Sequence, residues 1–222
     1  MPDDQHPDLE WQGDVPVASR FGDPYYSLED GLAEARHVFL AGNGLPDRFV
    51  PGFHVAELGF GTGLNAIAAW AMWRESGMPG PLRFTSFELC PMAPADMSRA
   101  LSAFPEAFGL AAPLLAALGS GAQEFVADGL HLKIVLGDAR ETLARWDDAA
   151  DAWFLDGFAP ARNPELWTPR LLRQVALHTR PGATASTYSA ARSVRAGLAD
   201  AGFVVERAPG FGRKRHMTIA RS

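Results

Sequence analysis

The sequence has very little cysteine and no long apolar run. Cys90 is the only cysteine among 222 residues, so no disulfide can form within the chain, and this fits a reducing compartment. The apolar stretches are far too short to span a bilayer, and the acidic, polar start MPDDQHPDLEW does not look like a secretory signal. We therefore expect a cytoplasmic protein that is not bound to a membrane.

The sequence also lacks the spacing of a metal site. Its six histidines, at positions 6, 37, 54, 131, 178 and 216, do not fall at the intervals that zinc ligands show. We expect no metal, and we interpret Cys90 as a small packed residue rather than a nucleophile.

Acidic residues are scarce in the C-terminal third. Residues 1–156 carry 9 Lys and Arg against 23 Asp and Glu, whereas residues 157–222 carry 11 against 3. The net charge of −6 argues against a simple nucleic-acid binder, but this asymmetry indicates an anionic partner for the C-terminal third. A solvated helix face with a basic tail explains the charges equally well, and charge alone leaves both interpretations open.

Apolar patterns alternate between strand and helix spacing after an irregular segment over 1–27. Ser27 is placed to cap a first helix that ends at the glycines of 42–44. Five strands are expected within 53–60, 82–89, 130–138, 151–156 and 182–189, with helices between them and a hairpin over 202–221. This order predicts an α/β fold, a mostly parallel doubly wound sheet with a C-terminal antiparallel hairpin. We expect one domain over 1–222: an N-terminal extension and helix in 1–50, then a core over 51–222 with a helical insertion near 91–120.

The stretch ELGFGTGLN, residues 57–65, follows the first core strand and opens a helix. Gly59, Gly61 and Gly63 allow a tight turn and close approach of a ligand. A dinucleotide fingerprint needs glycine or alanine at position 64, where this chain has leucine. Glu57 suits a cationic ligand group, such as the ammonium of a methionine moiety. A tight strand–helix turn without a ligand is the plainer alternative.

Acids also end the next two strands. Glu88 is placed to accept hydrogen bonds from both hydroxyls of a ribose, as the acid after the second strand does in nucleotide-binding folds. Asp138, followed by Ala139, could bind an adenine amino group, and a helix N-cap is an equally good interpretation of it. Three strand ends with suitable groups predict a nucleoside pocket of the kind found in Rossmann-like S-adenosylmethionine-dependent methyltransferases.

The fourth strand ends in FLDGFAP, with Asp156 at its carboxyl end. A protonated amine has no lone pair, so it cannot attack a methyl group until a base takes its proton. Asp156 can orient such an amine and accept that proton. Phe158 could stack on a base, and Pro160 fixes the turn. A rigid connection with a capping aspartate is the structural alternative.

Five stretches together resemble the methyltransferase domain of the MnmC family, which acts on the wobble uridine of tRNA. They are DPYYS, VFLAGNGLPDRF, ELGFGTGLN, AWFLDGFAPARNPELW and GFGRKRHM, and they extend from Asp23 to Met217. The flavin-dependent oxidase domain that follows in MnmC is not expected here. The chain is therefore similar to the stand-alone form, sometimes called MnmD.

The resemblance implies methyl transfer from S-adenosylmethionine to the amine of 5-aminomethyl-2-thiouridine, giving 5-methylaminomethyl-2-thiouridine. It implies Asp156 as the catalytic residue and the anticodon arm of tRNA as the partner. The implied donor-binding residues are Glu57, Gly59, Gly61, Gly63, Asn65, Glu88, Asp138 and Ala139. The implied substrate-side residues are Tyr25, Tyr26, Phe158, Pro160, Arg162, Arg213, Lys214 and Arg215. The last three would contact phosphates, helped by Arg192 and Arg195.

The sequence departs from the family pattern at three positions. Arg162 and Leu89 stand where lysine is common, and Arg192 stands where glycine is expected. Three other functions stay open on the sequence: an N-methyltransferase of a small molecule or protein amine, a dinucleotide-dependent oxidoreductase, which Leu64 argues against, and a binding module without catalysis.

Overall fold

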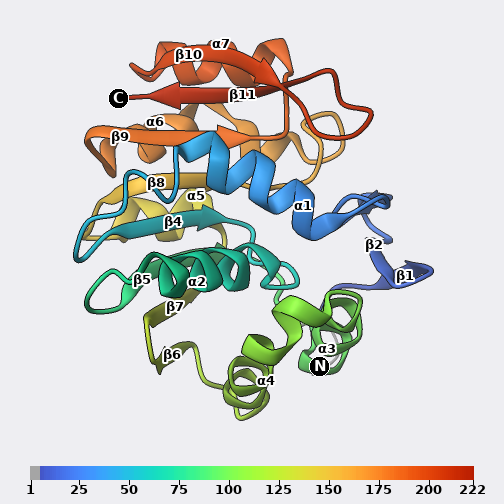
Figure 1. The fold of residues 1–222 in the computed structure, drawn as a ribbon. Helices are drawn as coiled ribbons and strands as arrows, with labels where there is room; N and C mark the ends of the chain where they lie inside the picture. Colours follow the sequence, from blue (N-terminus) through green and yellow to red (C-terminus); the bar gives the residue numbers. More distant parts are fainter. Residues whose placement is uncertain (1–5) are drawn as a thin grey trace.

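A computed structural model describes residues 6–222, and its centre is an eight-stranded sheet (Figure 1). The strand order is β10-β11-β9-β8-β4-β5-β7-β6. The bounds are β4 (His54–Leu58), β5 (Leu82–Glu88), β6 (Glu124–Ala127), β7 (Leu130–Leu136), β8 (Ala150–Leu155), β9 (Thr179–Thr187), β10 (Val204–Pro209) and β11 (His216–Arg221). The predicted α/β class and mostly parallel sheet are confirmed.

Strand directions follow from the connections. The five strands β7, β5, β4, β8 and β9 pair in parallel, and helical crossovers run from β4 to β5, from β7 to β8 and from β8 to β9. β11 pairs antiparallel with both β9 and β10, which confirms the predicted C-terminal hairpin. The sequence did not predict β6, a short antiparallel strand that pairs with β7 at the opposite edge.

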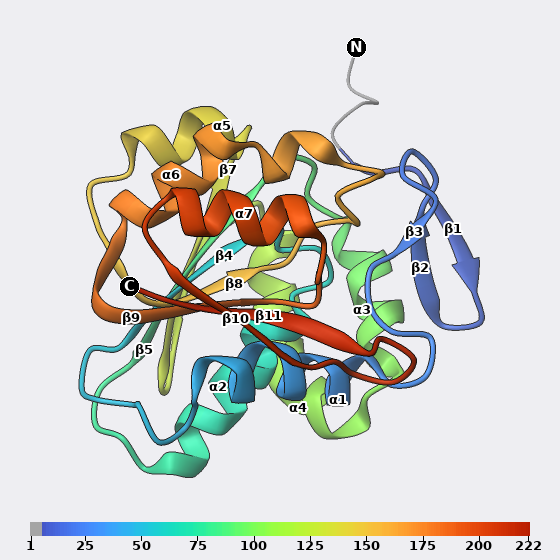
Figure 2. The same cartoon turned by 90° about the horizontal axis from the view of Figure 1, so that it is seen from above.

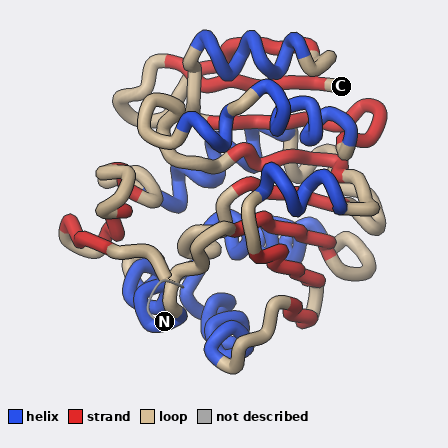
Figure 3. The backbone as a smooth tube through the Cα atoms, turned by 180° about the vertical axis from the view of Figure 1, so that it is seen from behind, coloured by secondary structure: helices blue, strands red, loops and turns tan. Residues whose placement is uncertain are grey.

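Helices cover both faces of the sheet (Figure 2). One face carries α1 (Gly31–Ala35), α2 (Leu64–Ser76), α3 (Pro94–Ser102) and α4 (Pro105–Gly119), and α1 continues as a π-helical turn (Arg36–Leu40) and a 3-10 turn (Ala41–Asn43). The other face carries α5 (Ala139–Thr142), a 3-10 turn (Leu143–Arg145), α6 (Pro169–Leu177) and α7 (Arg192–Asp200), seen from their own side in Figure 3. A further 3-10 turn (Pro164–Trp167) precedes α6. α3 and α4 lie between β5 and β6, and α6 begins with Thr168 as its N-cap and Pro169 as its first residue.

Each face has its own hydrophobic core. Trp73, Phe53 and Phe84 are among the largest fully buried side chains on the α2 side, and Trp153 packs on the α6 side. No helix within residues 6–222 is long and apolar enough to cross a membrane.

The N-terminal segment is more regular than predicted. Instead of irregular chain, it forms a small antiparallel sheet of β1 (Leu9–Gln12), β2 (Val15–Ala18) and β3 (Asp23–Pro24). The cap of the first helix is Asp30, whose carboxylate accepts from the backbone N–H of Ala33, rather than Ser27. Asp30 occupies the position directly before the first helical residue, where a side-chain oxygen reaches the free N–H groups. The predicted end of this helical segment is confirmed at Gly44, which has a φ of 67°.

Candidate active site

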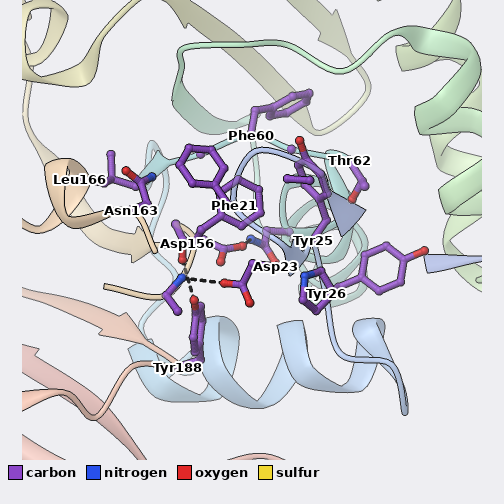
Figure 4. Close-up of a pocket in the computed structure, with 18 of the residues that line it drawn as sticks. Phe21, Asp23, Tyr25, Tyr26, Phe60, Thr62, Asp156, Asn163, Leu166 and Tyr188 are labelled. Carbon is purple, nitrogen blue, oxygen red and sulfur yellow. Dashed lines mark hydrogen bonds between the residues drawn. The ribbon is translucent and has the colours of Figure 1, made fainter. Parts of the chain in front are cut away.

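A cavity of about 890 Å³ lies at the carboxyl ends of the parallel strands. Its walls come from the segments that follow β4, β5, β7, β8 and β9, from the N-terminal segment, and from the loop between β10 and β11. Figure 4 shows side chains from these segments around the cavity, among them Asp156, Tyr188 and Asp23. Parallel strands bring the ends of distant sequence segments to one edge of the sheet, and that is where such folds bind ligands.

The glycine loop packs directly on the Asp156 corner. Gly59 has a φ of 90°, and a Cβ atom at this position would overlap the backbone carbonyl oxygen of Asp156. Gly63, with a φ of 78°, directly precedes the first residue of α2. Glycine is therefore required at position 59 both by backbone conformation and by the close approach of two strand ends.

Glu88 fastens the glycine loop to the end of β5. One carboxylate oxygen accepts from the backbone N–H groups of Phe60 at 2.9 Å and Gly61 at 3.1 Å. The other accepts from the backbone N–H of Cys90 at 2.7 Å. Burial raises the pKa of Glu88, and these hydrogen bonds to the charged form oppose the rise. Since each carboxylate oxygen has two lone pairs, these bonds occupy Oε2 fully and leave at most one acceptor position, on Oε1, for a ligand in the cavity.

Glu57 is fully buried and does not line the cavity. Its two oxygens accept from Asn65 Nδ2 at 2.9 Å and from Ser86 Oγ at 2.6 Å. Burial raises the pKa of Glu57 well above its usual value, and the hydrogen bonds from Ser86 and Asn65 oppose the rise. The structure thus does not bring Glu57 to a position where it could directly contact the ammonium of a ligand.

Asn65 connects Glu57 to Asp156. Its Nδ2 also donates to Asp156 Oδ2 at 2.6 Å, so one amide group joins the first turn of α2, β4 and the end of β8. The pKa of Asp156 is raised to about 7, chiefly by burial and in addition by the nearby charge of Glu34. The Asn65 hydrogen bond and the positive charge of Lys214 act in the opposite direction. A carboxylate with this pKa can accept a proton near neutral pH.

Asp138 and Ala139 form the wall of the cavity that follows β7. Asp138 caps α5, because its Oδ1 accepts from the backbone N–H of Arg140 at 2.8 Å. Its carboxylate also accepts from the Arg140 guanidinium, which lowers the pKa of Asp138. The N-cap interpretation is therefore confirmed, and the same side chain still faces the cavity.

Residues 110–222 match the family described as S-adenosyl-L-methionine-dependent methyltransferase. The chain belongs to this family. The methyl donor is accordingly S-adenosylmethionine, and the predicted oxidoreductase alternative is wrong for this family.

Curated relatives carry the name tRNA 5-methylaminomethyl-2-thiouridine biosynthesis bifunctional protein MnmC. The protein from Pseudomonas paraeruginosa is 44% identical over 98% of this chain, and the one from Hahella chejuensis is 45% identical over 96%. The chain spans only 35% and 36% of those two proteins, about a third of their length. The crystal structure of MNMC2 from Aquifex aeolicus matches 99% of this chain and 71% of that chain, with 26% identity and a TM-score of 0.77. The resemblance to the MnmC methyltransferase domain is confirmed.

Three walls of the cavity offer different groups to the donor of this methyltransferase. The turn after β4 forms one wall, with backbone at Gly59 and Gly61 and the side chains of Phe60 and Thr62. Glu88 stands on the next wall, and Asp138 with Ala139 closes the third. These residues would hold the methionine, ribose and adenine parts of S-adenosylmethionine in that order. Their individual roles stay predictions.

Aromatic side chains surround the Asp156 end of the cavity. The ring of Phe158 stacks on Phe21 with centroids 4.7 Å apart, and Tyr25 meets its edge at 5.1 Å. Tyr26 borders the cavity, but its hydroxyl donates to the backbone oxygens of Asp14 and Ala100, and its ring packs on Phe104. We therefore assign Tyr26 to anchoring the N-terminal segment. Pro160 lies outside the cavity in the turn after Asp156.

The predicted basic residues differ in their surroundings. Arg162 lies outside the cavity, 4.0 Å from Asp23, and also donates to the Phe21 carbonyl. Arg213 forms an ion pair with Glu29 at 3.2 Å, and Lys214 forms one with Glu34 at 2.9 Å. Lys214 Nζ also lies 3.9 Å from the centre of the Tyr188 ring. Within residues 6–222, Arg215 has no carboxylate within 4.0 Å.

Sequence reasoning missed three residues at this site. Tyr188 follows β9, lines the cavity and donates to the Gly157 carbonyl at 2.8 Å. Because it follows a parallel strand, the rule that identified Glu88 and Asp156 could have found it. Asp23 accepts from the backbone N–H of Ala159 at 2.8 Å, and it belongs to the DPYYS stretch. Glu34 lies on α1, whose approach to the cavity no local pattern indicates.

The structure contains no candidate metal centre in the part of the chain that it describes. Residues 6–222 include no group of three or more His, Cys, Asp and Glu side chains close enough to share an ion.

Proposed function

We propose that this methyltransferase transfers a methyl group from S-adenosylmethionine to the exocyclic amine of 5-aminomethyl-2-thiouridine at the wobble position of tRNA, giving 5-methylaminomethyl-2-thiouridine. The observation that carries the proposal is the alignment of 98% of this chain, at 44% identity, with a protein named for biosynthesis of that nucleoside. The position of Asp156 between the glycine loop and an aromatic wall supports the same reaction.

The chemistry requires one proton to be removed from the substrate. S-adenosylmethionine, when bound, supplies a methyl group on a positively charged sulfur. The amine must present a lone pair, so its ammonium form has to lose a proton first. Asp156, with a pKa of about 7, can orient the amine and accept that proton, both at its Oδ1. The new N–C bond then forms as the S–C bond breaks, and the proton passes from Asp156 to water.

Asn65 and the aromatic side chains have supporting roles in this proposal. Asn65 fixes the Asp156 carboxylate through the 2.6 Å hydrogen bond, which leaves Oδ1 for the amine. Phe21, Tyr25 and Phe158 form an apolar surface on which a flipped-out pyrimidine can stack. A wobble base is single-stranded, so turning it into the cavity requires little energy.

The test is transfer of radiolabelled methyl from S-adenosylmethionine to tRNA from cells that lack this modification. We expect label on the wobble uridine with the wild-type protein and a loss of at least about 100-fold with Asp156→Asn, a typical effect of removing a general base. Asp147→Asn, at an exposed position before β8, is the matched control and should keep full activity.

Donor binding separates the possible failures. If wild-type protein binds S-adenosylmethionine but labels no tRNA, while it labels a free amine, the tRNA substrate is wrong. If Asp156→Asn binds the donor and retains full transfer, the role of Asp156 is wrong.

A further inference from the structure

The C-terminal third contains two kinds of basic residue that the sequence does not distinguish. Arg162, Arg180, Arg213 and Lys214 each have a carboxylate of this chain within 4.0 Å. Within residues 6–222, no carboxylate lies that close to the guanidinium groups of α6 and α7. These groups belong to Arg170 and Arg173 on α6 and to Arg192 and Arg195 on α7.

This difference decides which cations are free to bind an outside anion. A paired cation must give up an internal carboxylate before it contacts a phosphate, which offsets the gain. An arginine without such a partner can contact the phosphate directly, and the nucleic acid then releases a condensed counterion, which favours binding. The four helix arginines are therefore better suited to phosphate binding than Arg213 or Lys214.

The four arginines lie on two neighbouring helices, and we call them the α6–α7 arginine patch. Each pair is three residues apart, so its two side chains share one side of their helix. The opposite side is apolar, with Leu171, Leu172 and Val175 of α6 and Val194 and Leu198 of α7 buried against the sheet. α6 carries no acidic residue, and the one acid of α7 is Asp200 at its last position.

The two helices are held rigidly together. A Cβ atom on Gly197 of α7 would lie 2.7 Å from Leu172 Cδ1 of α6, so only glycine permits this close approach. Figures 1 and 2 show α6 and α7 side by side on the same face of the sheet. The packing of α6 on α7 therefore sets the backbone positions that carry the four arginines.

The patch begins next to the cavity. Glu165 and Leu166, which line the cavity, belong to the turn directly before α6. Tyr188, another lining residue, lies four positions before the first residue of α7. Both arginine pairs lie within the first five residues of their helices, toward the sheet edge where the cavity opens.

We propose that the α6–α7 arginine patch binds the sugar–phosphate backbone of the tRNA whose wobble base enters the cavity. This inference rests on the proposed function for its substrate and adds where the RNA lies: over α6 and α7, rather than centred on the loop between β10 and β11. A polyanion anchored by one base in the cavity suits four arginines without internal ion pairs on two helices that begin next to the cavity.

The test compares two variants that lose the same charge. The patch variant is Arg170→Gln, Arg173→Gln, Arg192→Gln and Arg195→Gln together. The control variant removes four exposed cations outside α6 and α7 that have no carboxylate within 4.0 Å in residues 6–222. It combines Arg74→Gln, Lys133→Gln, Arg145→Gln and Arg221→Gln.

Binding of unmodified tRNA is measured by fluorescence anisotropy between 50 and 300 mM KCl, roughly the range over which phosphate contacts show their salt dependence. If all four arginines contact phosphates, the patch variant should lose about 3 units of the slope of log K against log salt, and about 10²–10³-fold in affinity near 150 mM salt. The control variant should lose less than about a tenth of that effect. Circular dichroism and binding of S-adenosylmethionine should be the same for all three proteins.

Equal losses in both variants, or no loss in the patch variant, would overturn the inference. The outcome is separable from that of the proposed function, because binding is measured without catalysis. Patch-dependent binding without labelling of the wobble uridine would leave the arginine patch in place and remove the proposed reaction. If the wild-type protein labels the wobble uridine but the patch variant binds tRNA as tightly as wild type does, the proposed reaction stands and the role of the arginine patch is wrong.

Discussion

Asp156 is expected to reduce the stability of the folded protein at neutral pH, and Asp156→Asn tests this. Its ordinary pKa of 3.8 is raised to about 7 in the folded chain, chiefly by burial. Between these values the unfolded chain has released the proton and the folded chain still binds it. The free energy of unfolding therefore falls as pH rises from about 4 to about 7, and the loss is complete above the folded pKa.

The magnitude follows from the pKa difference. A difference of about 3 units corresponds to about 4 kcal/mol. Because the side chain borders the cavity and is only partly shielded from water, we expect about half of this, ~2 kcal/mol. Asparagine has nearly the same shape, can accept the hydrogen bond from Asn65, and carries no charge at any pH. Asp156→Asn should therefore be more stable than wild type by ~2 kcal/mol at pH 8, which raises Tm by about 4–8 °C, and should match it near pH 4.

The assay is urea or thermal unfolding of wild type, Asp156→Asn and the exposed control Asp147→Asn from pH 4 to pH 8. The control should follow wild type throughout. A difference between Asp156→Asn and wild type that stays constant with pH, or a variant that is less stable at pH 8, would refute the reasoning. It would mean that the folded protein holds Asp156 in its charged form without cost.

Three further predictions follow from single contacts. Asn65→Leu removes the 2.6 Å hydrogen bond that lowers the pKa of Asp156, so the acidic limb of the pH profile of kcat should move from near pH 7 upward by about 1 unit or more. An unmoved profile would mean that Asn65 does not influence the pKa of Asp156. Gly59→Ala should destabilise the fold by at least about 2 kcal/mol more than Gly52→Ala in urea unfolding, because both have positive φ but only Gly59 meets the Asp156 carbonyl; equal effects would contradict this. Replacing Arg213, Lys214 and Arg215 together by alanine should lower the salt slope of tRNA binding by no more than about 1. Of the three, only Arg215 has no carboxylate within 4.0 Å in residues 6–222. A loss of about 3 in the slope would show that the ion pairs of Arg213 and Lys214 open on binding.

The alternation of apolar patterns was sufficient to predict the class of the fold. Strand and helix periods are local properties, and a parallel sheet follows from helical crossovers whatever the side chains are. The short strand β6 and the small N-terminal sheet were missed, because strands of four residues or fewer carry too little periodicity to be recognised. The cap of the first helix was misplaced by three residues, since both Ser27 and Asp30 have suitable side chains and only the backbone path chooses between them.

The sequence by itself determined which groups stand at the strand ends: the glycine turn, Glu88, Asp138 and Asp156. The tertiary structure decided what each of them does, because burial and partners are set by segments far apart in the chain. It placed Glu57 behind the cavity wall, joined Asn65 to Asp156, and added Tyr188. It also separated paired cations from unpaired ones, since an ion pair such as Lys214 with Glu34 links residues that no local pattern connects. Composition fixes how many charges a chain has, and only the fold fixes which of them remain free for a partner.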